Sequence, residues 1–217
     1  MVLLIYGSGG LGRGIYDWIT RTDYKEKWQE IIFLNDMEDE EEFYGTRKIH
    51  FESVPLYFNK DEVEVLIALG EPANREKLYQ KVKAFGYRFA TYIDELATVS
   101  PTAQIGEGVI ICPYALIDSQ VSIGENSLIE HSCMIGHDAT IGSNTVISIN
   151  SAIGGFTVLG DKVFLGIQTV IKDRIAIGNN VISAMGTVIF KDVENGMTVM
   201  GNPGRVTKGR EEHRVFG

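Results

Sequence analysis

Branched aliphatic residues recur every six positions between Val99 and Ile189. Fifteen of these sixteen anchor positions hold Ile, Leu or Val, and the exception is Ser183. A helix would repeat its apolar positions about every 3.6 residues and a half-buried strand every second residue. The six-residue period therefore favours short strands joined by turns and stacked into a left-handed parallel β-helix, in which three hexads form one triangular coil.

Two other positions of the hexad support this interpretation. The residue after the anchor is often glycine, where we expect a turn with positive φ. The residue four positions after the anchor is mostly small or β-branched, and we expect it to point into a narrow core. This second set comprises Ala103, Val109, Ala115, Val121, Ser127, Cys133, Ala139, Thr145, Ser151, Thr157, Val163 and Thr169. We predict about five coils, each burying its apolar face on the next.

The first 95 residues have a different pattern, typical of a small α/β domain with a parallel, Rossmann-like sheet. Strands are predicted at residues 2–6, 30–34, 63–69 and 89–92, and helices at residues 13–20 and 75–85. The acidic run at residues 38–42 is interpreted as a solvated loop. We therefore expect two domains, residues 1–95 and residues 96–217.

A Gly-x-Gly-x-x-Gly loop follows the first strand, in the run Gly7-Ser8-Gly9-Gly10-Leu11-Gly12. Such a loop lets the backbone approach phosphates and directs a helix N-terminus at an anion. Asp36 follows the second strand, where a ribose-binding carboxylate would lie. The domain is about half the size of a full dinucleotide-binding fold, so a mononucleotide fits better. A tight turn that only packs helix on strand is the alternative.

Composition narrows the class of protein. The formal net charge is −9 and the pI about 5.0, which disfavours nucleic-acid binding. The two cysteines do not suggest a disulfide framework, and Cys133 is interpreted as a core thiol. We expect no secretory signal, no membrane span and a cytoplasmic protein. No His, Cys or Asp cluster has metal-ligand spacing, so we expect no metal.

Four histidines are present. His50 and His213 lie in poorly patterned segments and are interpreted as bystanders. His131 and His137 both occupy the second position after an anchor, in successive hexads. Since successive hexads lie on successive faces of the prism, we expect these two side chains to point in different directions and to form no pair.

Three features of the chain together resemble a known protein family. They are the order of a Gly-rich domain followed by hexads, the run Ile135-Gly136-His137-Asp138 and the tail Gly201-Asn202-Pro203-Gly204-Arg205. The chain resembles the family of sialic-acid O-acetyltransferases and nucleotide-sugar N-acetyltransferases, and within it the UDP-4-amino-sugar N-acetyltransferases of bacterial glycan synthesis. The resemblance implies acetyl-CoA as donor and a homotrimer with its active site between neighbouring prisms. Ungapped matching from Cys112 onward puts the family's catalytic histidine on His137 and its following acid on Asp138.

His137 would then be the general base that takes a proton from the acceptor. The pKa of an ordinary imidazole lies close to working pH, which suits this role. A carboxylate partner would fix the tautomer of the ring. Neighbouring residues of a strand point to opposite sides, so a contact between Asp138 and His137 requires a bend in the chain.

The resemblance also implies the binding residues of both substrates. CoA would contact Val146, Gly155, Ile167, Met185 and Gly186. Lys191 and Arg205 are candidate ligands of its phosphates because they lie near the last coil and in the tail. The nucleotide sugar would contact Gly7, Ser8, Gly9, Gly10, Asn35, Asp36 and Gly70. The family often has histidine at the position of Val146 and glycine at that of Met185. It usually has histidine at the position of Leu11 and aspartate at that of Asn35.

Because of these departures, the sequence does not determine which acceptor binds or how the pantetheine arm of CoA would lie. Lys172 and Arg174 interrupt a segment that is usually neutral, and they are interpreted either as ligands of CoA phosphates or as a solvated corner. Two other functions remain as alternatives: an acyltransferase for a different small acceptor such as serine, and a nucleotide-sugar-binding scaffold without catalysis.

Overall fold

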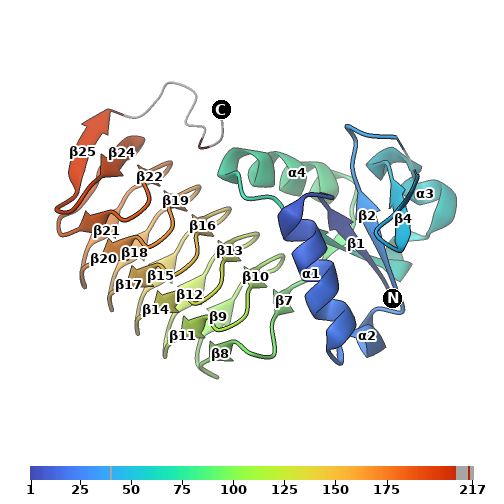
Figure 1. Cartoon of the computed structure of the whole chain (residues 1–217), viewed down its shortest axis with the longest axis horizontal. Coiled ribbons are helices and arrows are strands. Elements are labelled where there is room, and N and C mark those ends of the chain that lie inside the picture. The colour runs from blue at the N-terminus through green and yellow to red at the C-terminus, as the bar shows by residue number, and fades with distance from the viewer. Residues whose placement is uncertain (40, 209–214, 216–217) are drawn as a thin grey trace. The chain divides into compact units, whose positions relative to one another are not determined.

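The computed structural model describes residues 1–39, 41–208 and 215 (Figure 1). These residues form two compact units. Unit 1 contains Met1–Gly70 and Lys77–Thr91, and unit 2 contains Glu71–Glu76 and the chain from Tyr92 onward. Each unit has its own hydrophobic core.

Unit 1 is built on a six-stranded sheet in the order β3-β4-β2-β1-β5-β6. The central strand β1 pairs in parallel with β2 and β5. Leu3, Leu4 and Ile5 of β1 are fully buried, so both faces of the sheet are covered, as parallel sheets require. The strands are β1 (Val2–Tyr6), β2 (Glu30–Leu34), β3 (Glu41–Phe43), β4 (Thr46–Ile49), β5 (Val63–Ile67) and β6 (Arg88–Phe89).

The longest helices of unit 1 follow the ends of β1 and β5. Helix α1 buries Gly12, Ile15 and Ile19, spaced so that they share one face. Its first turn begins at Gly10, earlier than the predicted residue 13. The helices are α1 (Gly10–Arg21), α2 (Tyr24–Lys27), α3 (Val54–Tyr57) and α4 (Pro72–Ala84), with 3-10 turns η1 (Phe51–Ser53) and η2 (Lys60–Glu62). The first residues of α4 group with unit 2.

The acidic run is not only the solvated loop that its composition suggested. Glu41 begins β3, which pairs antiparallel with β4. The ammonium group of Lys48 is 2.7 Å from a carboxylate oxygen of Glu38 and 2.6 Å from one of Glu41, and the Lys48 side chain is 3% exposed. The negative charges of this run therefore neutralise a buried lysine.

Unit 2 is a parallel β-helix whose strands form three sheets (Figure 1). The first sheet contains β7 (Tyr92–Ile93), β10 (Ile110–Ile111), β13 (Leu128–Ile129), β16 (Val146–Ile147), β19 (Phe164–Leu165), β22 (Ile182–Ser183), β24 (Met197–Met200) and β25 (Arg205–Lys208). The second contains β8 (Thr98–Val99), β11 (Leu116–Ile117), β14 (Met134–Ile135), β17 (Ala152–Ile153), β20 (Val170–Ile171) and β23 (Val188–Ile189). The third contains β9 (Gln104–Ile105), β12 (Ser122–Ile123), β15 (Thr140–Ile141), β18 (Val158–Leu159) and β21 (Ala176–Ile177).

The predicted anchors are confirmed as core residues. Every anchor from Val99 to Ile189 is the second residue of a strand, and strands one coil apart pair in register, as Ile117 does with Ile135. The polar anchor Ser183 is buried, and its hydroxyl accepts a hydrogen bond from the backbone N–H of Gly166 and pairs with the Thr169 hydroxyl at 2.7 Å. The β-helix begins earlier than predicted, as the pairing of β7 with β10 shows.

The expected reason for the repeated glycines is wrong. Positive φ falls three residues after the anchor, for example at Asn126 (55°) and Asn144 (56°). The glycine directly after the anchor is required by close packing between coils. A Cβ on Gly142 would lie 2.4 Å from the backbone of Gly160.

Beyond Asp192 the chain leaves the six-residue phase. Strands β24 and β25 form an antiparallel hairpin at the end of the first sheet. This hairpin carries Arg205 and Lys208. Arg210, His213 and Arg214, which the sequence assigns to the same tail, lie outside the described residues.

Candidate active site

His137 and Asp138 lie in the turn that follows β14, between the second and third sheets. Asp138 adopts φ of 59°, which bends the chain and brings two neighbouring side chains to the same side. Nδ1 of His137 is 2.8 Å from Oδ2 of Asp138. The structure thus contains the bend that this contact requires.

One edge of the His137 imidazole faces Gly155. A Cβ on Gly155 would lie 3.0 Å from Nε2 of His137 and 3.1 Å from Cε1, which is closer than side chains ordinarily approach. The ring is 51% exposed and the Asp138 side chain 41%. With Nδ1 held by the carboxylate, Nε2 is the ring nitrogen that a substrate can reach.

Residues 18 apart stack on one another along this corner, because the strands pair in register. We call it the histidine corner; it comprises residues 136–138, 154–156, 172–174 and 190–192. His137, Gly155, Asp173 and Lys191 occupy the same position in the four successive turns of the corner. Neighbouring strands are about 4.8 Å apart, so Lys191 lies three coils, or about 14 Å, beyond His137.

The remaining predicted CoA residues lie elsewhere in the chain. Ile167, Met185 and Gly186 occupy a second corner, between the first and second sheets, and the side chains of Ile167 and Met185 are exposed. Val146 faces outward from the first sheet but is 1% exposed, so its side chain offers a ligand no surface. Arg205 is exposed on β25. One copy of the chain therefore does not bring all these residues to His137.

His131 lies on the second corner, after β13, and not on the histidine corner. The two histidines thus follow strands of different sheets, as the hexad phase predicts. Burial lowers the pKa of His131, and the charge of Asp94 partly opposes this effect. His50, interpreted as a bystander, hydrogen-bonds to the carbonyl oxygen of Glu38 through Nε2.

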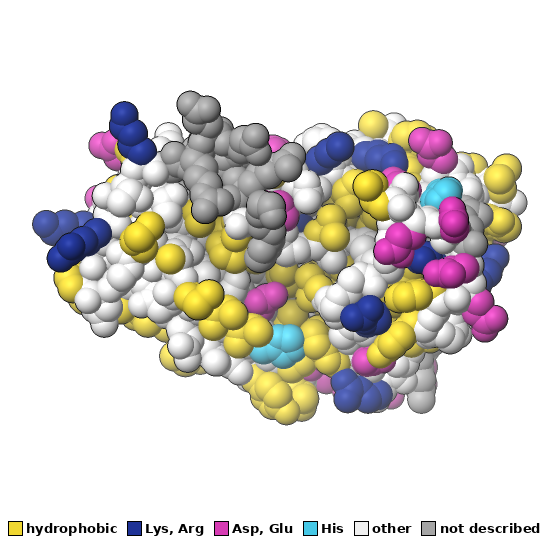
Figure 2. Space-filling model, turned by 45° about the horizontal axis from the view of Figure 1, so that its top comes forward, with side chains coloured by type: hydrophobic (Ala, Val, Ile, Leu, Met, Phe, Trp, Pro, Cys, Tyr) yellow, Lys and Arg dark blue, Asp and Glu magenta, His cyan; other side chains and the backbone are white. Residues whose placement is uncertain are grey.

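The three outer faces of the β-helix differ in character. On the first sheet Ile110, Leu128 and Val146 are buried, whereas the third sheet presents polar side chains such as those of Gln104 and Thr140. The second sheet exposes a row of apolar side chains, which we call the apolar face: Leu116 (41%), Met134 (52%) and Val170 (41%). Figure 2 shows hydrophobic side chains gathered over the visible side of the β-helix.

In unit 1, the predicted nucleotide-binding loop joins β1 to α1. Gly7 has φ of 122°, and a Cβ there would lie 2.7 Å from the carbonyl oxygen of Ala68. Gly9 is the N-cap of α1 and provides no capping side chain. The first backbone N–H groups of the helix therefore remain available for an anion.

The carboxyl ends of β1, β2 and β5 bring the other predicted residues to the same edge of the sheet, since these strands are parallel neighbours. Asn35 follows β2 and donates a hydrogen bond from Nδ2 to the hydroxyl of Ser8 at 2.7 Å. Gly70 follows β5. The loop, Asn35 and Gly70 thus form one candidate site at the edge where α/β sheets bind ligands.

Asp36 is already engaged within unit 1. Its Oδ2 accepts hydrogen bonds from Tyr6 and from Lys81, the latter at 2.7 Å, and its Oδ1 accepts one from the backbone N–H of Phe51 at 2.9 Å. Burial opposes the negative charge, but these hydrogen bonds outweigh it and lower the pKa of Asp36. The sequence analysis missed Tyr6 and Lys81, because no motif marks them.

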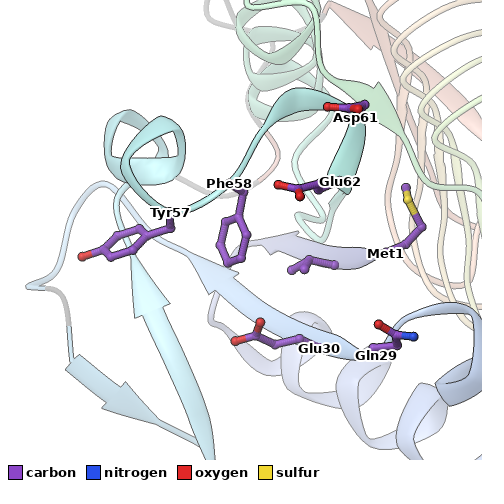
Figure 3. A pocket seen from close by; sticks show the side chains of 8 residues that line it. Met1, Gln29, Glu30, Tyr57, Phe58, Asp61 and Glu62 are labelled. Carbon is purple, nitrogen blue, oxygen red and sulfur yellow. The ribbon is translucent and has the colours of Figure 1, made fainter.

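A groove of about 720 Å³ opens at the opposite edge of the same sheet, where the strands begin (Figure 3). It is lined by Met1, Val2, Gln29, Glu30, Tyr57, Phe58, Asp61 and Glu62. None of the predicted site residues lines it. We therefore assign the candidate site by its chemistry and not by the size of this cavity.

Within the part of the chain that is described, no group of three or more His, Cys, Asp or Glu side chains could hold a metal ion. The same residues include no helix long and apolar enough to cross a membrane.

Two parts of the chain match models of known protein families. Residues 2–82 match the PglD N-terminal domain, and residues 120–155 match the bacterial transferase hexapeptide model of six repeats. The two matches cover separate parts of the chain.

Solved structures similar to this chain have the same two-part fold. WeeI from Acinetobacter baumannii AYE is 24% identical with a TM-score of 0.88, covering 95% of this chain and 100% of that one. The acetyltransferase domain of PglB from Neisseria gonorrhoeae FA1090 is 23% identical with a TM-score of 0.87, covering 94% and 98%. A histidine-to-asparagine variant of perosamine N-acetyltransferase from Caulobacter crescentus, in complex with CoA and GDP-perosamine, is 20% identical with a TM-score of 0.86, covering 95% and 97%.

Proposed function

We propose that this protein transfers an acetyl group from acetyl-CoA to an amino group of a nucleotide-linked sugar, with His137 as general base. The observation that carries the proposal is the hydrogen bond between His137 and Asp138, which leaves Nε2 open beside Gly155. The similar perosamine N-acetyltransferase, solved with CoA and GDP-perosamine, supports the same donor and the same class of acceptor.

The proposed step moves one proton and one acetyl group. Acetyl-CoA supplies the acetyl group as an activated thioester. Nε2 of His137 takes a proton from the acceptor nitrogen as this nitrogen bonds to the carbonyl carbon, while the C–S bond breaks and the sulfur of CoA leaves. The Asp138 carboxylate accepts a hydrogen bond from Nδ1–H of His137 and so favours the tautomer whose Nε2 carries no proton and can act as base.

The residues of the histidine corner fit CoA. Gly155 leaves room for a thioester beside Nε2. Lys191 lies about 14 Å further along the same corner, where its ammonium group can meet a phosphate of an extended pantetheine arm. Both residues therefore remain in the proposed CoA site, and Arg205 is a second candidate for phosphate contact.

The acceptor nucleotide would bind at the edge of unit 1 formed by Gly7, Ser8, Gly9, Gly10, Asn35 and Gly70. The open N-terminus of α1 suits its phosphates. Asp36 would stabilise this site through its hydrogen bonds to Lys81 and the backbone of Phe51, and direct contact with the ribose would be its lesser role. We also propose a cytoplasmic location, since acetyl-CoA must reach the site.

We propose a homotrimer with cyclic symmetry, in which the apolar face is buried between copies. Rows of exposed apolar side chains of this kind mark protein interfaces. The second sheet carries the histidine corner on one side and the second corner on the other. Threefold closure would bring the histidine corner of one copy against the second corner of the next. Ile167, Met185 and Gly186 would then complete the CoA site from a neighbouring copy.

Thiol release from acetyl-CoA tests the proposal directly, with UDP-, GDP- and dTDP-linked 4-amino sugars, free sialic acid and serine as acceptors. We expect turnover with a nucleotide-linked amino sugar, reduced by roughly 10²-fold or more in His137→Ala. His131→Ala tests the other histidine: turnover that is lost in this variant and kept in His137→Ala would assign the base to His131. Turnover with serine alone would assign a different acceptor class. CoA binding without turnover would point to a scaffold, and equal turnover in His137→Ala would exclude His137 as base.

A further inference from the structure

Phe156 is an unusual residue for its place in the histidine corner. It adopts φ of 58°, and the corner residues one coil before and after it, Asp138 and Arg174, adopt 59° and 60°. Bulky side chains are uncommon in this left-handed region, and several other such positions of the β-helix hold asparagine. The Phe156 ring is nevertheless 42% exposed. Tyr114, at φ of 62°, is a second exposed aromatic at such a position, so the contacts of Phe156 must show whether it has a role at the site.

The contacts of Phe156 suggest that role. Its ring centroid is 5.1 Å from that of His137, and the two planes are nearly perpendicular at 86°. This edge-to-face arrangement is one that aromatic rings prefer. The hydrogen bond to Asp138 fixes only the Nδ1 side of the imidazole, so the plane of the ring requires a further contact.

Arg174 covers the same phenyl ring. Its guanidinium carbon is 4.2 Å from the ring centroid of Phe156, within the range of a cation–π contact. The ion pair of Arg174 with Asp173 is long, at 3.9 Å, and both side chains are well exposed. The cation–π contact therefore lies well inside its usual range, whereas the ion pair is long for its kind, and the guanidinium fixes the phenyl ring from another side.

We propose that Phe156 is a positioning residue for His137, and that Arg174 holds Phe156 in place. The inference rests on the proposed role of His137 as base. In this arrangement Asp138 sets the tautomer, Phe156 sets the plane of the imidazole, and Gly155 leaves Nε2 accessible. Arg174 acts on the imidazole only through the phenyl ring.

The test compares Phe156→Ala, Phe156→Leu and Phe156→Tyr in the full-length chain. We expect kcat to fall roughly 10-fold in Phe156→Ala and Phe156→Leu, because small misplacements of reacting groups are costly. KM for acetyl-CoA should stay within about twofold, since the substitution removes no binding contact. Phe156→Tyr keeps the ring and should restore kcat. Arg174→Gln should lower kcat by a smaller factor, about two- to threefold.

A spectroscopic measurement on the free protein separates this inference from the proposed function. Ring 15N NMR of His137 reports which nitrogen carries the proton. We expect Phe156→Ala and Phe156→Leu to reduce the Nδ1-protonated tautomer, and Phe156→Tyr to preserve it. Tyr114→Ala removes an exposed aromatic at another corner position, with φ of 62°, and should leave the His137 signals unchanged.

Three results would decide the matter. Unchanged His137 signals and unchanged kcat in Phe156→Ala and Phe156→Leu, with turnover abolished in His137→Ala, would overturn the positioning role alone. Equal losses in Phe156→Tyr and Phe156→Ala would also overturn it, since the ring would then not matter. Full turnover in His137→Ala would overturn the proposed function, while the NMR signals would still show whether Phe156 holds the imidazole.

Discussion

Gly155 lies directly against the imidazole of His137, so that a Cβ on this glycine would come within 3.0 Å of Nε2. Its φ is not in the left-handed region, so backbone conformation does not explain the glycine. Gly154, the preceding residue, is explained by packing, because a Cβ there would lie 2.4 Å from the backbone nitrogen of Asp173. These two adjacent glycines therefore serve different purposes, one the fold and the other the space beside a ring nitrogen.

Gly155→Ala should separate activity from stability. The added methyl group crowds Nε2 and the backbone oxygen of His137, so we expect kcat/KM to fall at least about 10-fold. The Tm should fall less than in Gly154→Ala, since the exposed ring can shift and the backbone oxygen of His137, at 3.1 Å, has to move only slightly. Gly154→Ala is the contrast and should lower Tm through its clash with the next coil. Equal activity in Gly155→Ala and wild type would show that Nε2 needs no such space.

Asp138→Asn tests the partner of the imidazole. The amide can donate to Nδ1 and so favour the wrong tautomer, and we expect kcat to fall roughly 10–10²-fold. Because both side chains are well exposed, the pair should contribute less than about 1 kcal/mol to folding. Kinetics and chemical unfolding of the same preparation check both statements. A large loss of stability together with unchanged kcat would mean that the pair is structural.

Lys191→Gln tests the direction in which CoA lies along the corner. Removing a cation that meets a phosphate should raise KM for acetyl-CoA about 5–10-fold and leave kcat nearly unchanged. The effect should shrink at high salt, because exposed charges are screened. Lys208→Gln, an equivalent charge change on β25, serves as the control. A matching rise of KM in both variants would indicate a general charge effect and not a phosphate contact.

The β-helix could be predicted from the sequence because its period is a property of neighbouring residues. The anchors and the residues four positions later, such as Ile129 and Cys133 on the core side of one hexad, fill the same narrow interior in each coil. The bounds of β1 and β2 were also predicted, since both are short apolar runs. The hairpin of β3 and β4 was not, because the buried partner of the acidic run is a single lysine, Lys48, and carries no apolar signal.

The contacts of the candidate site were less accessible to sequence reasoning. The pair of His137 and Asp138 could be predicted because the residues are adjacent and match a family motif. Phe156 and Arg174 meet only because positions 18 residues apart stack, and neither belongs to a motif. Lys81 reaches Asp36 from a distant helix. Such contacts depend on how coils and helices pack, which no local pattern records.

From the contacts of Asp36 we predict how the folding stability of unit 1 depends on pH in acid. The pKa of Asp36 is lowered in the folded protein, so the unfolded chain binds more protons near and below the ordinary aspartate pKa of about 3.9. The carboxylate therefore stabilises unit 1 at neutral pH, and this contribution is lost as the pH falls through the lowered folded-state pKa. Asp36→Asn should cost about 1–3 kcal/mol at pH 7, and its difference from wild type should shrink in acid below pH of about 4.

Fluorescence can follow this effect in unit 1 alone, because both tryptophans, Trp18 and Trp28, belong to it. Denaturant unfolding at pH 3, 4, 5 and 7 gives the free energy of unfolding of wild type and variant at each pH. Lys81→Met removes the cationic partner and should reproduce most of the loss at neutral pH, since the charged carboxylate then keeps only Tyr6 and the backbone of Phe51. A difference between wild type and Asp36→Asn that stays constant from pH 7 to pH 3 would show that the carboxylate charge does not stabilise the fold.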